Sequence, residues 1–333
     1  MPNALYSVNI PVAISCRISS YFLKFCRLSF IYLNICSYAM EDLEKWEKAG
    51  KLGAQVLDYG VSLVKPGKTV LEITEAIEKR IDELGGKPAF PPQLSLNAAA
   101  AHECADPDDN VVLSDQLVKV DLGIQIDGCL SDNAATVDLS EKYKDLISAA
   151  KEALGLAIKE IKPGVEVRQI GKVIGEVIQL RGYEPIRNLS GHGLGKYEVH
   201  KSPSIPNYDN GDKTKLHKGM IIAVEPFATP GDGMISEKGI PRVFMQIDKK
   251  PIRDPFSREI LPYIESAYTG LPFSRRWLLK KFPKTKVDYA LRQLTTSGIL
   301  ESFAPLMEVS DKVVAQAEHT VLVEDEPVIL TKE

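Results

Sequence analysis

Two aspartates flank a predicted hairpin turn in the segment VKVDLGIQIDGCLSDNAATV. Asp127-Gly128 is a strong signal for a two-residue loop between strands, and that loop would place Asp121 opposite Ala134. Asp132 lies two residues from Ala134 and so shares a sheet face with Asp121, with Cα atoms on the order of 7–8 Å apart. These strands are otherwise largely apolar, and two buried like charges are unfavourable unless a cation neutralises them. The pair is a candidate metal site, and solvent-facing strand carboxylates are the alternative.

Three further residues could complete a metal centre. His192 lies in NLSGHGLGKYEVH among small residues, Glu225 ends the apolar run MIIAVEPF, and Glu318 lies in VVAQAEHTVLV. Gly123 would leave space beside Asp132. A set of two Asp, one His and two Glu is rich in oxygen and suits a pair of divalent ions such as Mn, Fe, Co or Zn. Paired metals of this kind can activate a water molecule and stabilise a tetrahedral transition state.

The bulk composition is that of an ordinary globular protein. The chain has 333 residues, of which 44% are hydrophobic, and a formal net charge of −4. A mildly acidic balance implies no general attraction to nucleic acid or to an anionic membrane. Five cysteines without a tight framework favour a reducing, cytoplasmic compartment over a disulfide scaffold.

The first 39 residues differ from the rest of the chain. They contain no Asp or Glu, and their longest uncharged stretches, Met1–Cys16 and Leu28–Met40, are shorter than the roughly 20 residues that span a bilayer. Met40 opens the acidic, helical sequence MEDLEKWEKAGKLGAQVL and resembles a natural start. We therefore expect residues 1–39 to be an extension with no role in the fold, and a signal peptide or anchor is the alternative.

An internal repeat organises the chain. Helices are predicted over 41–64 and 70–84, and again over 141–161 and 166–181. His102 and His200 fall in corresponding places, at an offset of 98. The residues that punctuate the helices recur at an offset of 97: Lys65, Pro66, Gly67, Gly85 and Pro88 match Lys162, Pro163, Gly164, Gly182 and Pro185. This pattern predicts two copies of a helix–helix–strand unit related by a pseudo-two-fold around a shared sheet.

The strands between the helices indicate an α/β (α+β) architecture with a curved, antiparallel-rich sheet. Strands are predicted over 118–126, 129–137, 220–224 and 313–323. Residues 249–310 interrupt this scheme with three predicted helices, at 258–266, 275–282 and 286–297, which suggest a small winged-helix-like insertion. Residues 40–248 and 311–333 would then form the catalytic domain.

The five candidate ligands, in their order and spacing, resemble the metal site of the pita-bread metallopeptidases. The segments NLSGHGLGKYEVHKSPSIPN, AVEPFATPGDG and AQAEHTVLV are similar to those of type 2 methionine aminopeptidases, particularly archaeal ones. The resemblance covers about residues 40–333, and type 2 enzymes also carry a helical insertion between their two glutamate ligands. It implies a pita-bread fold and removal of the initiator methionine from nascent polypeptides by two-metal hydrolysis of a Met–X bond in which X is small.

The same resemblance implies a role for each residue. Asp132 and Glu318 would bridge two metal ions that are also held by Asp121, His192 and Glu225. Glu225 would in addition act as general base, His200 would polarise the scissile carbonyl, and His102 would contact the peptide nitrogen. The methionine pocket would consist of Phe90, Val199, Phe227, Phe303 and Leu306. The chain departs from the family pattern at Glu103 and Cys104, which follow His102, at Gly193 and at Ala317.

Two other functions compete with this one. A proline-specific aminopeptidase of the same fold uses similar ligands, but such enzymes generally carry a large extra N-terminal domain. A non-catalytic pita-bread protein that binds RNA or protein partners would have lost metal ligands. The stretch between Lys249 and Val287 contains ten Lys or Arg against three Asp or Glu. A solvated face is the favoured interpretation of this bias, and contact of Arg275, Arg276, Lys280 and Lys281 with ribosomal RNA is the alternative. We expect a monomer that does not bind membranes.

Overall fold

The computed structural model describes residues 42–332, and Trp46–Glu333 form one compact unit. The predicted extension, residues 1–39, lies outside the described residues. A helix runs over residues 42–63 and is followed by α2 (Val70–Glu83), close to the predicted bounds. Within residues 42–332, no helix has both the length and the apolar character needed to cross a bilayer.

The predicted duplication is visible in the elements themselves. α2 is matched by α4 (Val167–Leu180), and the short strand β1 (Lys87–Pro88) is matched by β8 (Glu184–Pro185), each at the offset of the repeat. Both helices begin with a capping box, in which the side chains of the N-cap residue and of the residue three positions later exchange hydrogen bonds with the backbone. The shared boundaries confirm the prediction of two helix–helix–strand units.

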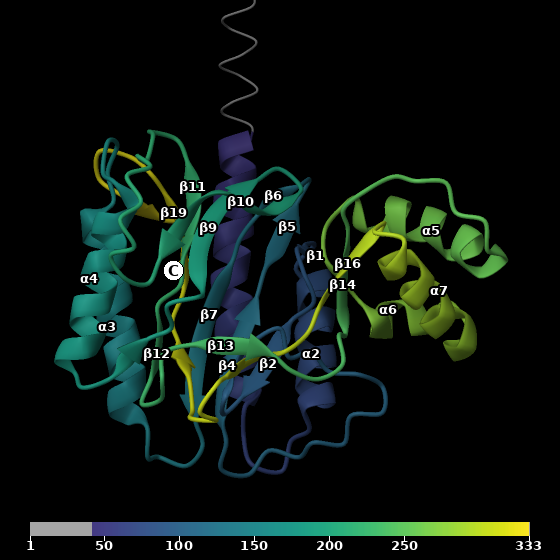
Figure 1. The fold of residues 1–333 in the computed structure, drawn as a ribbon, viewed down its shortest axis with the longest axis horizontal. Helices are drawn as coiled ribbons and strands as arrows, with labels where there is room; N and C mark the ends of the chain where they lie inside the picture. Colours follow the sequence, from purple (N-terminus) through teal and green to yellow (C-terminus); the bar gives the residue numbers. More distant parts are fainter. Residues whose placement is uncertain (1–41, 333) are drawn as a thin grey trace, which may run out of the picture. The chain divides into compact units, whose positions relative to one another are not determined.

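Glycines with positive φ occur at matching positions in the two copies of the repeat. Gly67 and Gly164 adopt φ values of 87° and 89°, and Gly85 and Gly182 adopt 75° and 79°. Only glycine adopts this left-handed region without a steric penalty. Gly67 and Gly164 form the turns that precede α2 and α4, and Gly85 and Gly182 follow the C-caps of these two helices, so the same glycine positions bound the helix in both units. The third helix of the repeat, α3 (Lys144–Glu160), lies against α4 on one side of the fold (Figure 1).

All described strand pairs are antiparallel, and the hairpin has the predicted register. Asp121 pairs with Ala134, and Ile126 pairs with Cys129. The strands of the first half form two small sheets, β2-β4-β7 and β1-β5-β6. Their bounds are β2 (Gln93–Leu96), β4 (Leu117–Leu122), β5 (Ile124–Ile126), β6 (Cys129–Leu130) and β7 (Asn133–Asp138). The two predicted hairpin strands are therefore each interrupted, at Gly123 and at 131–132.

The second half is built in the same way from the sheets β10-β9-β11-β19-β20 and β18-β12-β8. The run predicted as one strand over 313–323 is divided into two strands by residues 317–318, which places Glu318 at an irregular point between sheets. The bounds are β9 (Ser190–Gly195), β10 (Glu198–Pro206), β11 (Ile221–Val224), β12 (Phe227–Thr229), β18 (Ala315–Gln316), β19 (His319–Leu322) and β20 (Val328–Ile329).

The inserted segment forms a third packing unit beside the strands of the first half (Figure 1). Its helices are α5 (Pro255–Tyr268), α6 (Arg275–Leu279) and α7 (Lys284–Thr296), in the predicted order. They share a core with the sheet β15-β14-β16, made of β15 (Phe273–Ser274), β14 (Val243–Gln246) and β16 (Leu300–Phe303). The chain then returns to the main body, where β17 (Leu306–Glu308) lies between β13 (Ile235–Glu237) and β3 (Ala99–Ala101).

Candidate metal centre

Three of the predicted ligands form a tight carboxylate cluster. Asp121 on β4, Asp132 before β7 and Glu318 between β18 and β19 each offer an oxygen, and these oxygens all lie within 4.8 Å of one another. All three residues are buried. The Oδ1 atom of Asp121 is buried without any hydrogen-bond partner among the described residues. A buried acceptor that is left unpaired is costly in protein alone, so this donor set fits a bound cation.

Burial raises the pKa of every carboxyl group in the cluster. The pKa of Asp121 rises to about 7, because desolvation outweighs the hydrogen bond from Gln316. The pKa values of Asp132 and Glu318 are raised well above their usual range, first by burial and then by the neighbouring carboxylates. Without a cation, the folded protein therefore retains protons here at pH values where exposed carboxyl groups have lost them. A divalent ion would replace those protons.

Neighbouring polar side chains fix the orientation of the cluster. Thr320 accepts a hydrogen bond from the backbone N–H of Asp132 at 2.8 Å and donates its hydroxyl to the carbonyl of the same residue at 2.7 Å. Gln316 donates to Asp121 Oδ2 at 3.4 Å and to Glu318 Oε2 at 3.3 Å. These contacts join strands from opposite halves of the repeat, so the centre exists only when the two halves pack together.

His192 and Glu225 lie at the edge of this cluster. The Nε2 atom of His192 is 3.6 Å from Asp132 Oδ2 and 3.7 Å from Glu225 Oε1. Its Nδ1 atom is 3.1 Å from the carbonyl oxygen of Gly193, and burial lowers the pKa of its imidazole to about 3. A neutral ring that donates its Nδ1 proton to that carbonyl has its Nε2 lone pair directed at the carboxylates, which is the arrangement of a metal ligand. The pKa of Glu225 is also raised by burial and by Asp132.

Two glycines allow the close packing around these ligands. A Cβ atom at Gly193 would lie 2.6 Å from the carbonyl oxygen of Ser202, so only glycine lets β9 approach β10 here. A Cβ atom at Gly123 would lie 2.4 Å from the ring of Phe90. The space that we predicted beside Asp132 is thus filled by an aromatic side chain of the pocket wall.

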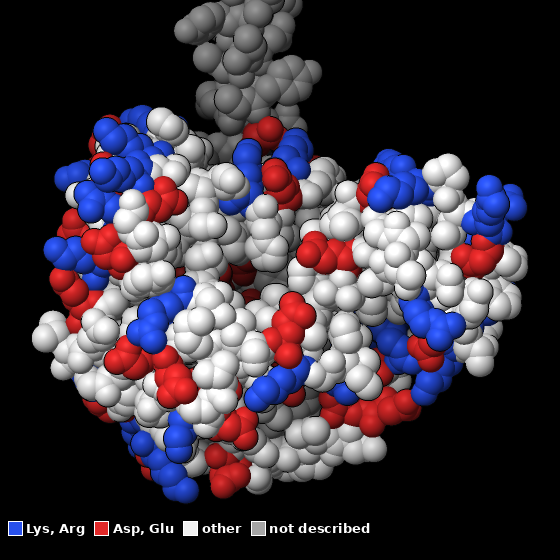
Figure 2. Space-filling view, viewed as in Figure 1, with Lys and Arg blue, Asp and Glu red and all other residues white. Residues whose placement is uncertain are grey.

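A cavity of about 290 Å³ opens onto the centre. Figure 2 shows this face of the molecule, where acidic side chains lie at the bottom of a hollow. Polar and apolar walls meet in the cavity, as a site for an amphipathic substrate requires. Every site residue predicted from the sequence lines it: Phe90, His102, Asp121, Asp132, His192, Val199, His200, Glu225, Phe227, Phe303, Leu306 and Glu318.

The two repeat-related histidines lie on the cavity wall. The rings of His200 and His192 meet edge to face, with centroids 4.6 Å apart. His102 meets Phe303 in the same way at 5.5 Å, and its backbone has a φ of 64°, a conformation that is rare outside glycine. The backbone N–H of His102 donates to Gln93 Oε1 at 2.5 Å. Burial lowers the pKa of His102 to about 4 and also lowers that of His200, so both rings are neutral at pH 7.

Three residues of the centre were not identified from the sequence: Gln93, Gln316 and Thr320. The alternation that placed Glu318 on the site face also places Gln316 and Thr320 on that face, and a buried polar residue beside a ligand is a recognisable signal. Gln93 pairs with Asp121 across β2 and β4, and no local pattern reveals that pairing.

The remaining histidines and the described cysteines are not part of the centre. His319 contacts Thr331 Oγ1 through Nδ1 at 3.0 Å, as expected for a structural residue, and His217 is exposed. Cys104 and Cys129 are both buried. Burial raises the pKa of Cys104, so its thiol stays protonated and unreactive at pH 7.

The fold and the buried carboxylate cluster of Asp121, Asp132 and Glu318 are those of a metal-dependent peptidase of the pita-bread type. This chain belongs to metallopeptidase family M24, whose family model matches residues 44–325. It is therefore a hydrolase, and its centre fits a pair of divalent ions whose identity the donor set leaves open.

Individual proteins similar to this chain are methionine aminopeptidases. The methionine aminopeptidase of Methanocaldococcus jannaschii is 41% identical over 293 residues, which cover 88% of this chain and 99% of that protein. The methionine aminopeptidase of Pyrococcus horikoshii is 43% identical over 294 residues, which cover 88% of this chain and 100% of that protein. Among solved structures, the crystal structure of methionine aminopeptidase from Thermotoga maritima matches with a TM-score of 0.64 and 26% identity, covering 88% of this chain and 97% of that one.

Proposed function

We propose that this protein removes the N-terminal methionine from nascent polypeptides by hydrolysis of a Met–X bond in which X is small. One observation carries the proposal: a single cavity brings together the five-ligand centre, two neutral histidines and an apolar wall of Phe90, Phe227 and other side chains. Relatives named methionine aminopeptidase match over almost their whole length, which supports the same activity here.

Each residue of the site has a separate role in the proposed hydrolysis. Two divalent ions held by the five ligands would supply an activated water and positive charge for the tetrahedral transition state. Glu225 lines the cavity beside His192, so it could accept a proton from the attacking water and later deliver it to the departing amine. His200 and His102 line the cavity as neutral rings. His200 would donate a hydrogen bond to the scissile carbonyl, and His102 would accept one from the N–H of the scissile peptide bond.

The apolar wall accounts for the choice of methionine. Phe90, Val199, Phe227 and Leu306 are buried in the protein yet line the cavity, and Phe303 closes it beside His102. An unbranched thioether fills such a pocket without an unpaired polar atom, whereas a charged side chain would be desolvated there. The proposed specificity is therefore determined by shape and desolvation at the first residue of the substrate.

The direct test is methionine release from the peptides Met-Ala-Ser and Ala-Pro-Ser by metal-stripped protein, with and without added Mn or Co. We expect metal-dependent cleavage of Met-Ala-Ser alone. Cleavage of Ala-Pro-Ser would instead support the proline-specific alternative. Cleavage of neither peptide, with metals demonstrably bound, would favour a non-catalytic binding module. Neither alternative is favoured, since all five ligand positions are filled and the relatives are methionine aminopeptidases.

We further propose that the enzyme acts in the cytoplasm as a monomer, and that the basic stretch of the insertion is mainly a solvated face. Contact with ribosomal RNA would rest on Lys280 and Lys281, which are exposed, because Arg275 and Arg276 are directed into the protein and paired with carboxylates. Salt-sensitive binding of ribosomes that is lost on replacing both lysines with Ala would support such contact. Binding that is unchanged by the double substitution would exclude it.

A further inference from the structure

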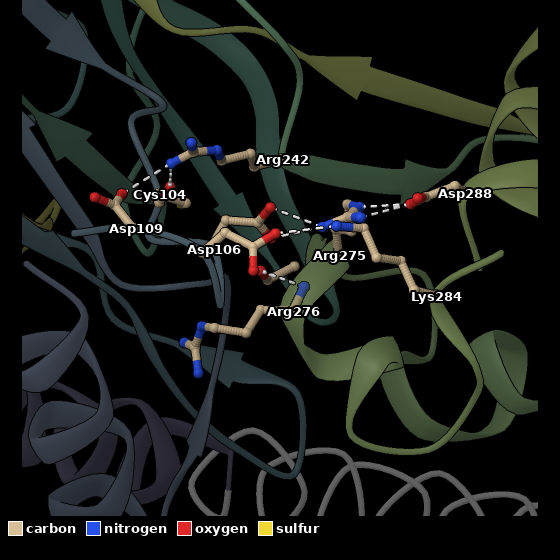
Figure 3. Close-up of polar contacts among 10 residues, drawn as sticks. Cys104, Asp106, Asp109, Arg242, Arg275, Arg276, Lys284 and Asp288 are labelled. Atoms are coloured by element: carbon tan, nitrogen blue, oxygen red, sulfur yellow. Dashed lines mark hydrogen bonds and ion pairs between the residues drawn. The ribbon is translucent and has the colours of Figure 1, made fainter.

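A loop rich in aspartate follows His102 and joins β3 to β4. Residues 102–116 contain no helix, and His102 begins this loop in a left-handed conformation. Hydrogen bonds from neighbouring segments therefore hold the backbone here, and the next residue, Glu103, accepts hydrogen bonds from the N–H groups of Leu94 and Leu96 of β2. On one side, Gln93 of β2 accepts the His102 N–H. On the other side, the loop contacts basic side chains of the inserted segment (Figure 3).

Two arginines make the contacts with the loop. Arg242 Nη1 donates to the carbonyl oxygen of Cys104 at 2.9 Å and to Asp109 Oδ2 at 3.0 Å. Arg275 Nη1 lies 2.9 Å and 2.7 Å from the two carboxylate oxygens of Asp106, and its Nε donates to Asp288 of α7 at 2.7 Å. Arg275 is thus shared between the loop and the helical insertion, and Figure 3 shows it between the two carboxylates.

These contacts are shielded from solvent to different degrees. The side chains of Arg275 and Asp106 are only 13% and 16% exposed, and Asp109 is 10% exposed. A third contact, between Lys284 and Asp108, is 61% and 76% exposed, so solvent and salt screen it. Charge-assisted hydrogen bonds in a partly buried setting are the stronger kind, and removing one partner leaves the other charge poorly solvated. We call the contacts of Arg242 and Arg275 with the loop the arginine clamp.

The clamp is joined directly to the cavity wall. The backbone N–H of Arg275 donates to the carbonyl oxygen of Arg242 at 2.9 Å, which holds the two arginines side by side. Arg242 immediately precedes Val243 of β14, and Val243 pairs with Phe303 of β16. Both Val243 and Phe303 line the cavity, and Phe303 is the ring that His102 meets. A displacement of the clamp would therefore reach His102 both along the loop and through the Phe303 ring.

We propose that Arg242 and Arg275 are positioning residues that fix His102 against the substrate by clamping its loop to the insertion. The proposal rests on the proposed function, in which His102 contacts the peptide nitrogen. It gives the insertion a role in the reaction itself: the insertion contributes residues to the cavity wall and also holds the neighbouring His102 in place. It also explains why Arg275, despite its place in a basic stretch, faces a carboxylate of the loop.

The test compares Arg275→Ala with His102→Ala, with the double variant, and with Arg258→Ala as a matched control. Arg258 lies on the exposed surface of α5, so its loss removes the same charge without touching the loop. The activity of the metal-loaded protein is measured on Met-Ala-Ser as kcat and KM, and hydrogen exchange is followed over residues 103–110. Binding of Mn to each variant is measured separately.

We expect Arg275→Ala to lower kcat/KM about tenfold or more, since small displacements of a positioned group are costly. Exchange over 103–110 should become faster, while Mn binding and the Arg258→Ala control stay within twofold of the wild type. In the His102→Ala background, the same arginine substitution should change kcat/KM by less than about twofold, because the clamp acts through His102. Arg275→Lys should restore part of the activity.

Three outcomes would overturn the proposal: unchanged exchange in the loop, an effect no larger than that of Arg258→Ala, or an undiminished effect in the His102→Ala background. If His102→Ala keeps full activity, then the role of His102 in the proposed function is wrong, and the exchange measurement still decides whether the clamp holds the loop. If Arg275→Ala fails to fold, Asp106→Asn, which weakens the same contact from the loop side, is measured in its place with the same expectations.

Discussion

The substitution Asp121→Asn should stabilise the metal-free protein at neutral pH while removing its response to metal. In the folded protein the pKa of Asp121 rises from an ordinary value of 3.8 to about 7, chiefly because the group is buried. A tenfold change in proton affinity corresponds to about 1.4 kcal/mol, so this one carboxyl group opposes folding by up to about 4 kcal/mol above pH 7. Asparagine has nearly the same shape and no charge, and it removes this unfavourable contribution.

The sign of the pH dependence follows from the same shift. Between pH 4 and 7 the folded metal-free protein binds more protons at Asp121 than the unfolded chain does, so its free energy of unfolding falls as the pH rises. Asp132, Glu225 and Glu318 have raised pKa values as well and act in the same direction. The buried rings of His102, His192 and His200 have lowered pKa values and act in the opposite direction, so the wild type is compared with the variant at each pH. In EDTA, the advantage of Asp121→Asn over the wild type in urea unfolding should be larger at pH 7.5 than at pH 5.

Metal should narrow the difference in stability between the two proteins. With Mn at about 100 times its dissociation constant, the wild type should gain about 2.7 kcal/mol, whereas Asp121→Asn should gain much less because a ligand is missing. Asp138→Asn is the control, since Asp138 lies at the end of the adjoining strand β7. Burial tends to raise the pKa of Asp138, but hydrogen bonds from Ser140 and Tyr143 lower it overall. Its loss should therefore destabilise the metal-free protein at pH 7.5.

The reasoning fails if the advantage of the metal-free Asp121→Asn variant over the wild type is the same at pH 5 and at pH 7.5. It also fails if Asp121→Asn destabilises the metal-free protein at pH 7.5 as Asp138→Asn is expected to do. Either result would mean that water or structural relaxation already solvates the carboxylate cluster, so that its burial in the folded protein imposes no electrostatic cost.

Three further outcomes are expected. His200→Ala should lower kcat for Met-Ala-Ser about 100-fold with little change in KM, because its ring faces the cavity and acts on the reacting carbonyl; an equal change in KM would indicate a binding role instead. Gly193→Ala should lower the free energy of unfolding in urea by about 1–3 kcal/mol, because the added carbon would lie 2.6 Å from the carbonyl oxygen of Ser202. An unchanged midpoint would show that β10 can shift away from the added carbon with no loss of stability. Phe303→Ala should reduce kcat/KM for Met-Ala-Ser by about tenfold or more through lost apolar contact in the pocket, and an unaltered value would remove Phe303 from the pocket.

Much of the fold follows from local patterns in the sequence. The boundaries of α2 and α4, and the left-handed glycines before and after these helices, recur at one offset because turn and capping chemistry depends on neighbouring residues. The pairing of Asp121 with Ala134 follows in the same way from the two-residue turn between their strands. The five ligand types also stand out locally, as charged or imidazole side chains in apolar or glycine-rich surroundings.

The tertiary structure decided what surrounds those residues. Gln93, Gln316 and Thr320 belong to the centre because strands from both halves of the repeat meet there. Arg275 contacts Asp106, which lies 169 residues away in the sequence. The sequence alone favours a solvated face for this basic residue, whereas the structure shows it at the contact between the loop and the insertion. Periodicity and turn signals report the environment of a few neighbouring residues, whereas the partner of a buried charge depends on how distant elements pack, and only the folded chain determines that.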